Sequence, residues 1–166
     1  MTFARRVTQV LHDEHDATTA LMARLEQLTA RSSGAVPDAG EPGVRRLLAD
    51  LSTVLTGEVE RHFAFEEERL FTYLSAIGEE AIGAHLAEEH AVIRPLGIRI
   101  AALARAAAAS GFDAASWSEF CRVGQDLAPR LIAHAHKEEM ALLPLLDESM
   151  DADTDMELFE AYTATA

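Results

Sequence analysis

Apolar residues at intervals of three and four run through four long stretches of the 166-residue chain, and this spacing constrains the fold more than any other feature. The stretches cover about residues 2–30, 43–76, 79–109 and 113–146, with short breaks rich in glycine, proline or serine between them. No stretch alternates as a half-buried strand would. Four long amphipathic helices with short connections predict an all-α fold, an antiparallel up-down four-helix bundle.

The acidic tail, residues 147–166, predicts a short C-terminal helix that docks weakly on the core bundle of about residues 2–146. Residues 1–166 are expected to form one domain, because a chain of this length with 49% hydrophobic residues can bury one core. Pro95 and Pro129 lie inside predicted helices, where each removes a backbone donor, and we expect kinks there rather than ends. In the alternative, the fourth helix begins only after Pro129.

The composition limits the classes of partner and site. The 28 acidic residues outnumber the 14 Lys and Arg, and the net charge of -14 argues against a nucleic-acid partner. Cys121 is the only cysteine, which excludes a disulfide framework, a Cys-based zinc site and a cysteine-ligated iron–sulfur cluster. No apolar run reaches the length of a signal peptide or a membrane span. We therefore expect a cytoplasmic protein without a membrane partner, as a monomer or a homodimer.

Two copies of His-x-x-x-Glu-Glu-x-x-Leu occur, one in the second helical stretch and one in the fourth. His62 and Glu66 begin the first copy, and His134 and Glu138 begin the second. In each copy the histidine and the first glutamate face the same side of the helix as the leucines. A carboxylate buried without a partner is costly, and a shared metal ion is the simplest partner for two such pairs.

The other two helical stretches each direct one histidine inward. His15 lies on the apolar stripe of the first stretch, and His90 lies on that of the third. The spacing from His15 to His62 is similar to that from His90 to His134, as though one helix pair were used twice. A pseudo-two-fold bundle would bring these imidazoles and the two glutamates together at its axis. Imidazole combined with carboxylate suits iron, manganese or zinc.

The order His, His-x-x-x-Glu, His, His-x-x-x-Glu over about residues 8–146 resembles the signature of the bacterial hemerythrin HHE cation-binding domains. The resemblance implies two iron ions, as Fe2+ or Fe3+, with an oxo or hydroxo bridge when oxidised. By analogy, the histidines of the first two helices serve one iron, those of the last two serve the other, and both glutamates bridge. The implied metal ligands are His15, His62, Glu66, His90, His134 and Glu138.

The chain departs from the oxygen-carrying hemerythrins in its third helix. Those proteins have a fifth histidine from a His-x-x-x-His motif, whereas here Leu86 stands four residues before His90, and His85 points about 140° away from the inward face. His12, one turn before His15, is an alternative fifth ligand, or else it lies at the surface or supports a ligand from outside.

Four nearby residues are expected to lie at the surface or in the core rather than to bind metal. Glu67 and Glu139 lie about 100° further round their helices and should be solvated, and His136 should lie at the surface. Tyr73 lies on the inward stripe and should pack in the core, with a redox or gating role as the alternative.

The resemblance implies a protein that binds or reacts with a small ligand, O2, H2O2 or NO, in redox stress or iron homeostasis. As an enzyme it would be a weak catalase or peroxidase, or an NO-reactive protein. The alternative is an oxygen- or iron-binding protein that senses, stores or buffers without turnover. Ferritin-like oxidase chemistry is disfavoured because it uses Glu-x-x-His, and no histidine here has an acid three residues before it.

Overall fold

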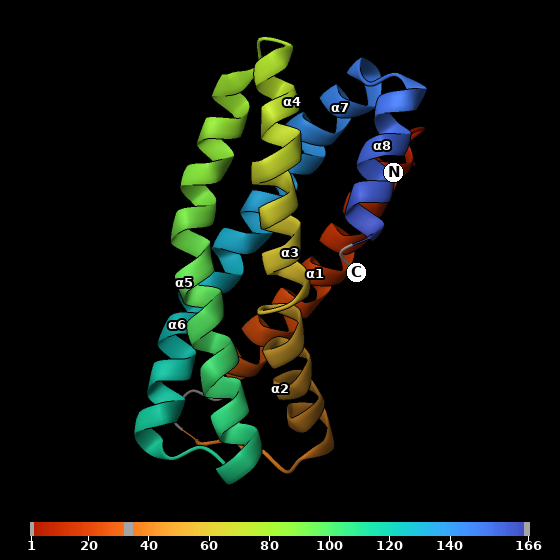
Figure 1. Ribbon diagram of the computed structural model, residues 1–166. Coiled ribbons are helices and arrows are strands. Elements are labelled where there is room, and N and C mark those ends of the chain that lie inside the picture. The colour runs from red at the N-terminus through yellow and green to blue at the C-terminus, as the bar shows by residue number, and fades with distance from the viewer. Residues whose placement is uncertain (1, 32–34, 165–166) are drawn as a thin grey trace.

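The computed structural model describes residues 2–31 and 35–164, and within these ranges it is helical and contains no strand (Figure 1). Two π-helical segments, η1 (Glu66–Leu70) and η2 (Glu138–Leu142), interrupt the α-helices. The α-helices are α1 (Arg6–Arg31), α2 (Pro42–Val54), α3 (Glu58–Phe65), α4 (Phe71–Ala76), α5 (Glu80–Ser110), α6 (Ala114–Lys137), α7 (Leu143–Ser149) and α8 (Ala152–Thr163). The predicted all-α bundle with a C-terminal helix is confirmed.

Four columns of helix surround the core. α1 packs against α2 and α6, and α5 packs against the same two helices from the other side. The segments α3, η1 and α4 extend the α2 column, while η2 and α7 extend α6 (Figure 1). Across the described ranges, no helix combines the length and the apolar character that a membrane span requires.

Local signals fix the turn between α5 and α6. Gly111, directly after α5, has a φ of 78°, a left-handed conformation that glycine adopts without steric cost. Asp113 then caps α6, since its carboxylate accepts from the Ser116 N–H at 2.7 Å. Helices α5 and α6 therefore turn back on each other within a few residues.

The second predicted helix, residues 43–76, is not continuous. A turn at residues 55–57 ends α2 and starts α3, and Gly57 has φ −115° and ψ −77°. A Cβ at this glycine would lie 2.9 Å from the Thr53 carbonyl oxygen, so the turn requires a residue without a side chain. An isolated glycine inside an apolar helical pattern is a weak signal, which is why the break escaped the sequence prediction.

Both internal prolines lie within continuous helices. α5 runs through Pro95 and α6 runs through Pro129, so the alternative in which a helix begins after Pro129 is wrong. Each proline removes one hydrogen bond at a cost of about 3 kcal/mol, which the tertiary packing of a long helix can offset.

The apolar core consists of two clusters with a polar layer between them. The lower cluster in Figure 1 joins α1, α2, α5 and α6, and it includes Leu25, Leu51 and Phe120. The upper cluster joins the start of α1 to α4, α7 and α8, and it includes Leu70 and Leu142. The buried histidines and glutamates lie between these clusters.

The C-terminal helix is docked firmly, so the expectation of weak docking is wrong. The Asp155 carboxylate on α8 is buried and accepts from the Arg6 and Val7 N–H groups at 3.0 Å each. These are orphan donors at the start of α1, so a charge-assisted bond to them stabilises both helices. Tyr162 near the end of α8 is only 2% exposed. The composition of the tail did not predict these contacts, because Asp155 and Tyr162 are single residues in an acidic segment.

Candidate metal centre

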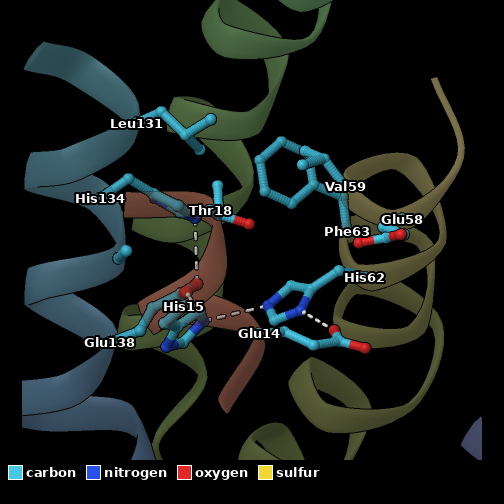
Figure 2. Close-up of a pocket in the computed structure, with 11 residues that line it drawn as sticks. Glu14, His15, Thr18, Glu58, Val59, His62, Phe63, Leu131, His134 and Glu138 are labelled. Atoms are coloured by element: carbon cyan, nitrogen blue, oxygen red, sulfur yellow. Dashed lines mark hydrogen bonds and ion pairs between the residues drawn. The ribbon is translucent and has the colours of Figure 1, made fainter. Parts of the chain in front are cut away.

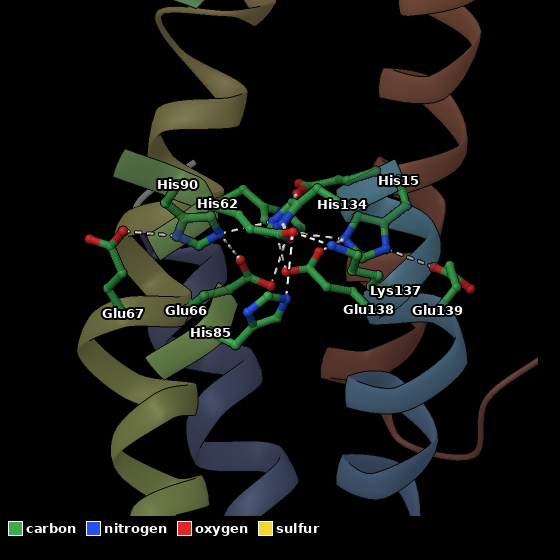
Figure 3. Close-up of polar contacts among 12 residues, drawn as sticks. His15, His62, Glu66, Glu67, His85, His90, His134, Lys137, Glu138 and Glu139 are labelled. Atoms are coloured by element: carbon green, nitrogen blue, oxygen red, sulfur yellow. Dashed lines mark hydrogen bonds and ion pairs between the residues drawn. The ribbon is translucent and has the colours of Figure 1, made fainter. Parts of the chain in front are cut away.

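The six residues predicted as metal ligands come together in the polar layer of the bundle (Figure 3). All six side chains are buried, although every one of them is titratable. They form two groups that share Glu66 and Glu138, and the donor atoms of each group lie within 4.8 Å of one another. His15 and His62 complete one group, and His90 and His134 complete the other.

The imidazoles form two close pairs. The Nε2 atoms of His15 and His62 lie 3.1 Å apart, and those of His90 and His134 lie 3.0 Å apart. Atoms that share one metal ion at about 2.1 Å each are separated by about 3–4 Å, so both pairs have the spacing of common ligands.

Each buried glutamate spans the two imidazole pairs. Glu66 Oε1 lies 3.2 Å from His62 Nε2, and its Oε2 lies 3.4 Å from His90 Nε2. Glu138 makes the equivalent connection. Its Oε2 lies 2.9 Å from His15 Nε2, and its Oε1 lies 3.0 Å from His134 Nε2. One carboxylate oxygen therefore faces each pair, which is the arrangement of two bridging ligands.

Every imidazole also donates its Nδ1–H to a second carboxylate, which orients the ring. The donors and acceptors are His15 to Glu139 at 2.7 Å, His62 to Glu14 at 2.9 Å, His90 to Glu67 at 2.8 Å and His134 to Glu89 at 2.9 Å. We call these four acceptors the partner glutamates. Each of them also contacts a basic side chain: Arg61 for Glu14, Arg94 for Glu67, Lys137 for Glu89 and His12 for Glu139.

The ring orientation shows that the site fits a metal ion. A neutral imidazole whose Nδ1 carries the hydrogen has only a lone pair at Nε2. Two such lone pairs face each other at 3.1 Å between His15 and His62, and at 3.0 Å between His90 and His134. They repel each other unless a proton or a cation lies between them.

The carboxylate oxygens support the same conclusion. Both oxygens of Glu66 and Oε1 of Glu138 are buried, and as long as the imidazole Nε2 atoms carry no proton they have no hydrogen-bond donor within the described part of the chain. A buried carboxylate without donors is costly, and metal coordination removes that cost. Six imidazole and carboxylate ligands without a thiolate suit iron, manganese or zinc.

The two π-helical segments begin at the two buried glutamates. η1 starts at Glu66 and η2 starts at Glu138, and π-helical turns inside α-helices are frequent at functional sites. The wider turn keeps the next residue near the site as well. Glu67 and Glu139 therefore accept from His90 and His15, so the expectation that they are merely solvated is wrong.

The remaining candidates lie outside the two groups. His12 contacts Glu139 Oε2 with its Nδ1 at 2.8 Å, so it supports a partner glutamate in this structure. His85 and His136 are exposed. The hydroxyl of Tyr73 contacts Ser149 Oγ at 3.3 Å on the surface, away from the imidazoles.

Sequence reasoning missed two of the partner glutamates. Glu14 and Glu89 each come immediately before an inward histidine, in the repeated dipeptide Glu-His. A pseudo-two-fold chain places equivalent residues in equivalent sites, so this repeat was a usable signal. It escaped attention because neighbouring residues on a helix point about 100° apart.

Contacts between the imidazoles and the carboxylates raise the pKa values of three histidines and lower the pKa of Glu138. Burial alone would lower the pKa of His134, but the hydrogen bonds and charges of its glutamate neighbours outweigh burial and raise it to about 9. The pKa values of His15 and His62 are also raised, for the same reason. Burial would raise the pKa of Glu138, but bonds to His134 and His15 hold it well below its usual range. In the metal-free protein, protons on the imidazoles therefore take the place of cations.

The metal-free protein is expected to lose stability as the pH rises from about 6.5 to about 9. A histidine whose pKa is raised on folding stabilises the fold below its unfolded pKa, and this contribution disappears through its folded pKa of about 9. His134 alone contributes about 3 kcal/mol. Thermal unfolding at a series of pH values tests this, with metal-loaded protein as the control, because coordinated imidazoles carry no titrating proton. Equal stability of the metal-free protein at pH 6.5 and 9 would contradict the prediction.

A small cavity lies beside His15, His62 and His134 (Figure 2). The centre of a water-sized molecule can move within about 20 Å³ there, which is enough for one small molecule. Both imidazoles of the first pair line it, as does His134 of the second pair, together with the apolar side chains of Val59 and Leu131.

Aromatic rings cover His90, the other member of the second pair. The Phe63 ring stacks on His90 with the centroids 3.7 Å apart and an interplanar angle of 10°. The Phe71 ring lies near His90 at 5.7 Å. Both imidazoles of the His15–His62 pair therefore border the cavity, whereas in the second pair only His134 does and His90 is packed.

Comparison with known proteins assigns the family. A family model described as the hemerythrin HHE cation-binding domain matches residues 6–146, which include all six clustered ligands. A comparison with curated proteins found no match. Since the family model covers most of the chain and the buried His/Glu groups suit metal ions, the chain belongs to the hemerythrin HHE cation-binding domain family.

Proposed function

We propose that the protein holds two iron ions and reacts with a small ligand, either a peroxide or nitric oxide, at the ion that faces the cavity. One ion would take His15 and His62, the other would take His90 and His134, and Glu66 with Glu138 would bridge them. The observation that carries this proposal is the sharing of both buried glutamates between the two imidazole pairs.

The donor set supports iron. Each group offers two imidazoles and two carboxylates, so positions remain for a further ligand on an ion that accepts six. When bound, iron supplies one-electron redox chemistry and open coordination positions. The partner glutamates hold each imidazole in one orientation and strengthen it as a donor, as such outer partners do in metal sites.

The cavity supports a small ligand beside the His15–His62 pair, whose two imidazoles both line it. The space of about 20 Å³ open to the centre of a water-sized molecule suits a diatomic molecule or a peroxide. Glu58 also borders the cavity and is exposed, so it can exchange protons with solvent and deliver them to a bound peroxide. Peroxide turnover needs such a proton route, which favours reaction over simple binding.

A second candidate function is binding without turnover, as an oxygen or iron sensor, store or buffer. The apolar part of the cavity wall, which includes Val59, Phe63 and Leu131, favours this alternative. An apolar pocket suits O2 or NO and stabilises no charged product.

Anaerobic reconstitution with Fe2+ tests the proposal. We expect about two iron ions per chain by elemental analysis, in line with the two donor groups. The loaded protein is then exposed separately to O2, H2O2 and NO. Release of O2 from H2O2, or consumption of NO, supports the reactive function.

A stable and reversible absorption band with O2, without peroxide turnover, would favour the binding function instead. The matched control is the His136→Ala variant, because His136 is exposed on α6 and lies outside both donor groups. Wild-type protein that binds no iron under anaerobic conditions would overturn both functions.

A further inference from the structure

Tyr162 lies on α8, outside residues 6–146 that the family model matches, and yet its side chain reaches the metal centre. Its hydroxyl donates to Glu14 Oε2. The same oxygen accepts the Nδ1–H of His62 at 2.9 Å. Two donors from different helices therefore compete for one carboxylate oxygen, and one of them is an imidazole of the cavity-facing pair.

The surroundings hold this contact in place. Arg61 donates from Nη2 to the other oxygen of Glu14 at 2.7 Å, and its guanidinium carbon lies 4.9 Å from the centroid of the Tyr162 ring. The Phe65 ring packs against the Tyr162 ring, with the two ring centroids 4.6 Å apart. Tyr162 is 2% exposed, so solvent cannot replace the phenol as a donor without displacing α8.

The contact breaks the pseudo-two-fold symmetry of the site. Glu14 and Glu89 stand at equivalent positions, each immediately before an inward histidine. Glu89 accepts from His134 and Lys137, and no tyrosine in the described part of the chain contacts it, because Tyr73 bonds to Ser149. The phenol is therefore added only at Glu14, which lines the cavity, whereas Glu89 does not.

We propose that Tyr162 is a positioning residue that weakens the Glu14–His62 hydrogen bond and thereby raises the reduction potential of the metal ion that His62 holds. This inference rests on the proposed function, since it requires a redox-active ion at that imidazole.

The physical argument concerns the charge on Glu14. A carboxylate that accepts fewer hydrogen bonds is more basic, so it draws more strongly on the Nδ1 proton of His62. The imidazole then becomes a stronger electron donor through Nε2, which favours the ferric ion. By occupying Oε2, the Tyr162 hydroxyl moves the balance toward the ferrous ion that binds O2 and NO.

The test compares midpoint reduction potentials of iron-loaded variants by spectroelectrochemistry. Tyr162→Phe keeps the ring packing and removes the hydroxyl, and its potential should shift to more negative values. Glu14→Gln replaces the carboxylate by a weaker acceptor, so its potential should shift to more positive values, with iron affinity about 10- to 100-fold lower. Tyr73→Phe is the matched control and should leave the potential unchanged, since its hydroxyl contacts only Ser149 among the described residues.

The double variant shows whether Tyr162 acts through Glu14. In the Glu14→Gln background, Tyr162→Phe should no longer shift the potential to negative values. A shift of equal size in both backgrounds would indicate a general effect of undocking α8 and would overturn the inference. If the iron-loaded Tyr162→Phe and Tyr73→Phe variants have the same midpoint reduction potential, this inference fails and the proposed function stands. Wild-type protein that binds no iron overturns this inference and the proposed function together.

Discussion

Replacing Glu66 with alanine is expected to weaken iron binding by more than about 100-fold, because one side chain supplies a ligand to both donor groups. The glutamate is fully buried, and both of its oxygens lack a hydrogen-bond donor within the described ranges. Its loss also removes a carboxylate that partners the protonated imidazoles of the metal-free protein, so the metal-free variant should be less stable than the wild type. Iron content after anaerobic loading and the competition-measured affinity for Fe2+ give the result.

The two following glutamates provide matched controls for this prediction. Glu67 bonds to His90 Nδ1 at 2.8 Å, and its replacement by alanine should lower affinity by about 10- to 100-fold, as for other outer partners. Glu68 is exposed, and its replacement by alanine should change nothing. Equal iron affinity in the Glu66 and Glu68 variants would show that the buried glutamate is not a ligand.

Residues Glu66 and Glu67 also show which parts of the site could be predicted from the sequence. Helical periodicity was enough to place His62 and Glu66 on the core-facing side, since a spacing of four residues returns to the same face of a helix. The same rule placed Glu67 on a solvated face, because it assumed about 100° per residue throughout. The π-helical turn that begins at Glu66 breaks this assumption at the point where the site needs it.

Contacts between distant helices were the other part that the sequence could not supply. Apolar spacing predicts which face of a helix is buried, but it does not specify which residue of a neighbouring helix will meet it. Tyr73 and Tyr162 illustrate the difference, since the first lies on an inward stripe and the second lies in an acidic tail. In the fold, the first bonds at the surface and the second reaches Glu14.

Replacing Phe63 with alanine is expected to change both stability and ligand stoichiometry. Phe63 is 2% exposed in the lower apolar cluster, so the variant should lose about 3–5 kcal/mol of unfolding free energy. Its ring also lines the cavity and stacks on His90 at 3.7 Å. Removing the ring joins the cavity to the packed side of the site, where the second ion would be held.

Nitric oxide titration of the loaded, anaerobic protein separates the two effects of this replacement. If ligands reach only the ion at the His15–His62 pair, the wild type should bind about one NO per pair of ions and the Phe63→Ala variant about two. Phe120→Ala is the matched control, because Phe120 is 0% exposed in the same cluster but does not line the cavity. It should lose similar stability while still binding one NO. Two NO per wild-type centre would show that the aromatic rings do not close the His90 side, and the asymmetry assigned to the centre would be wrong.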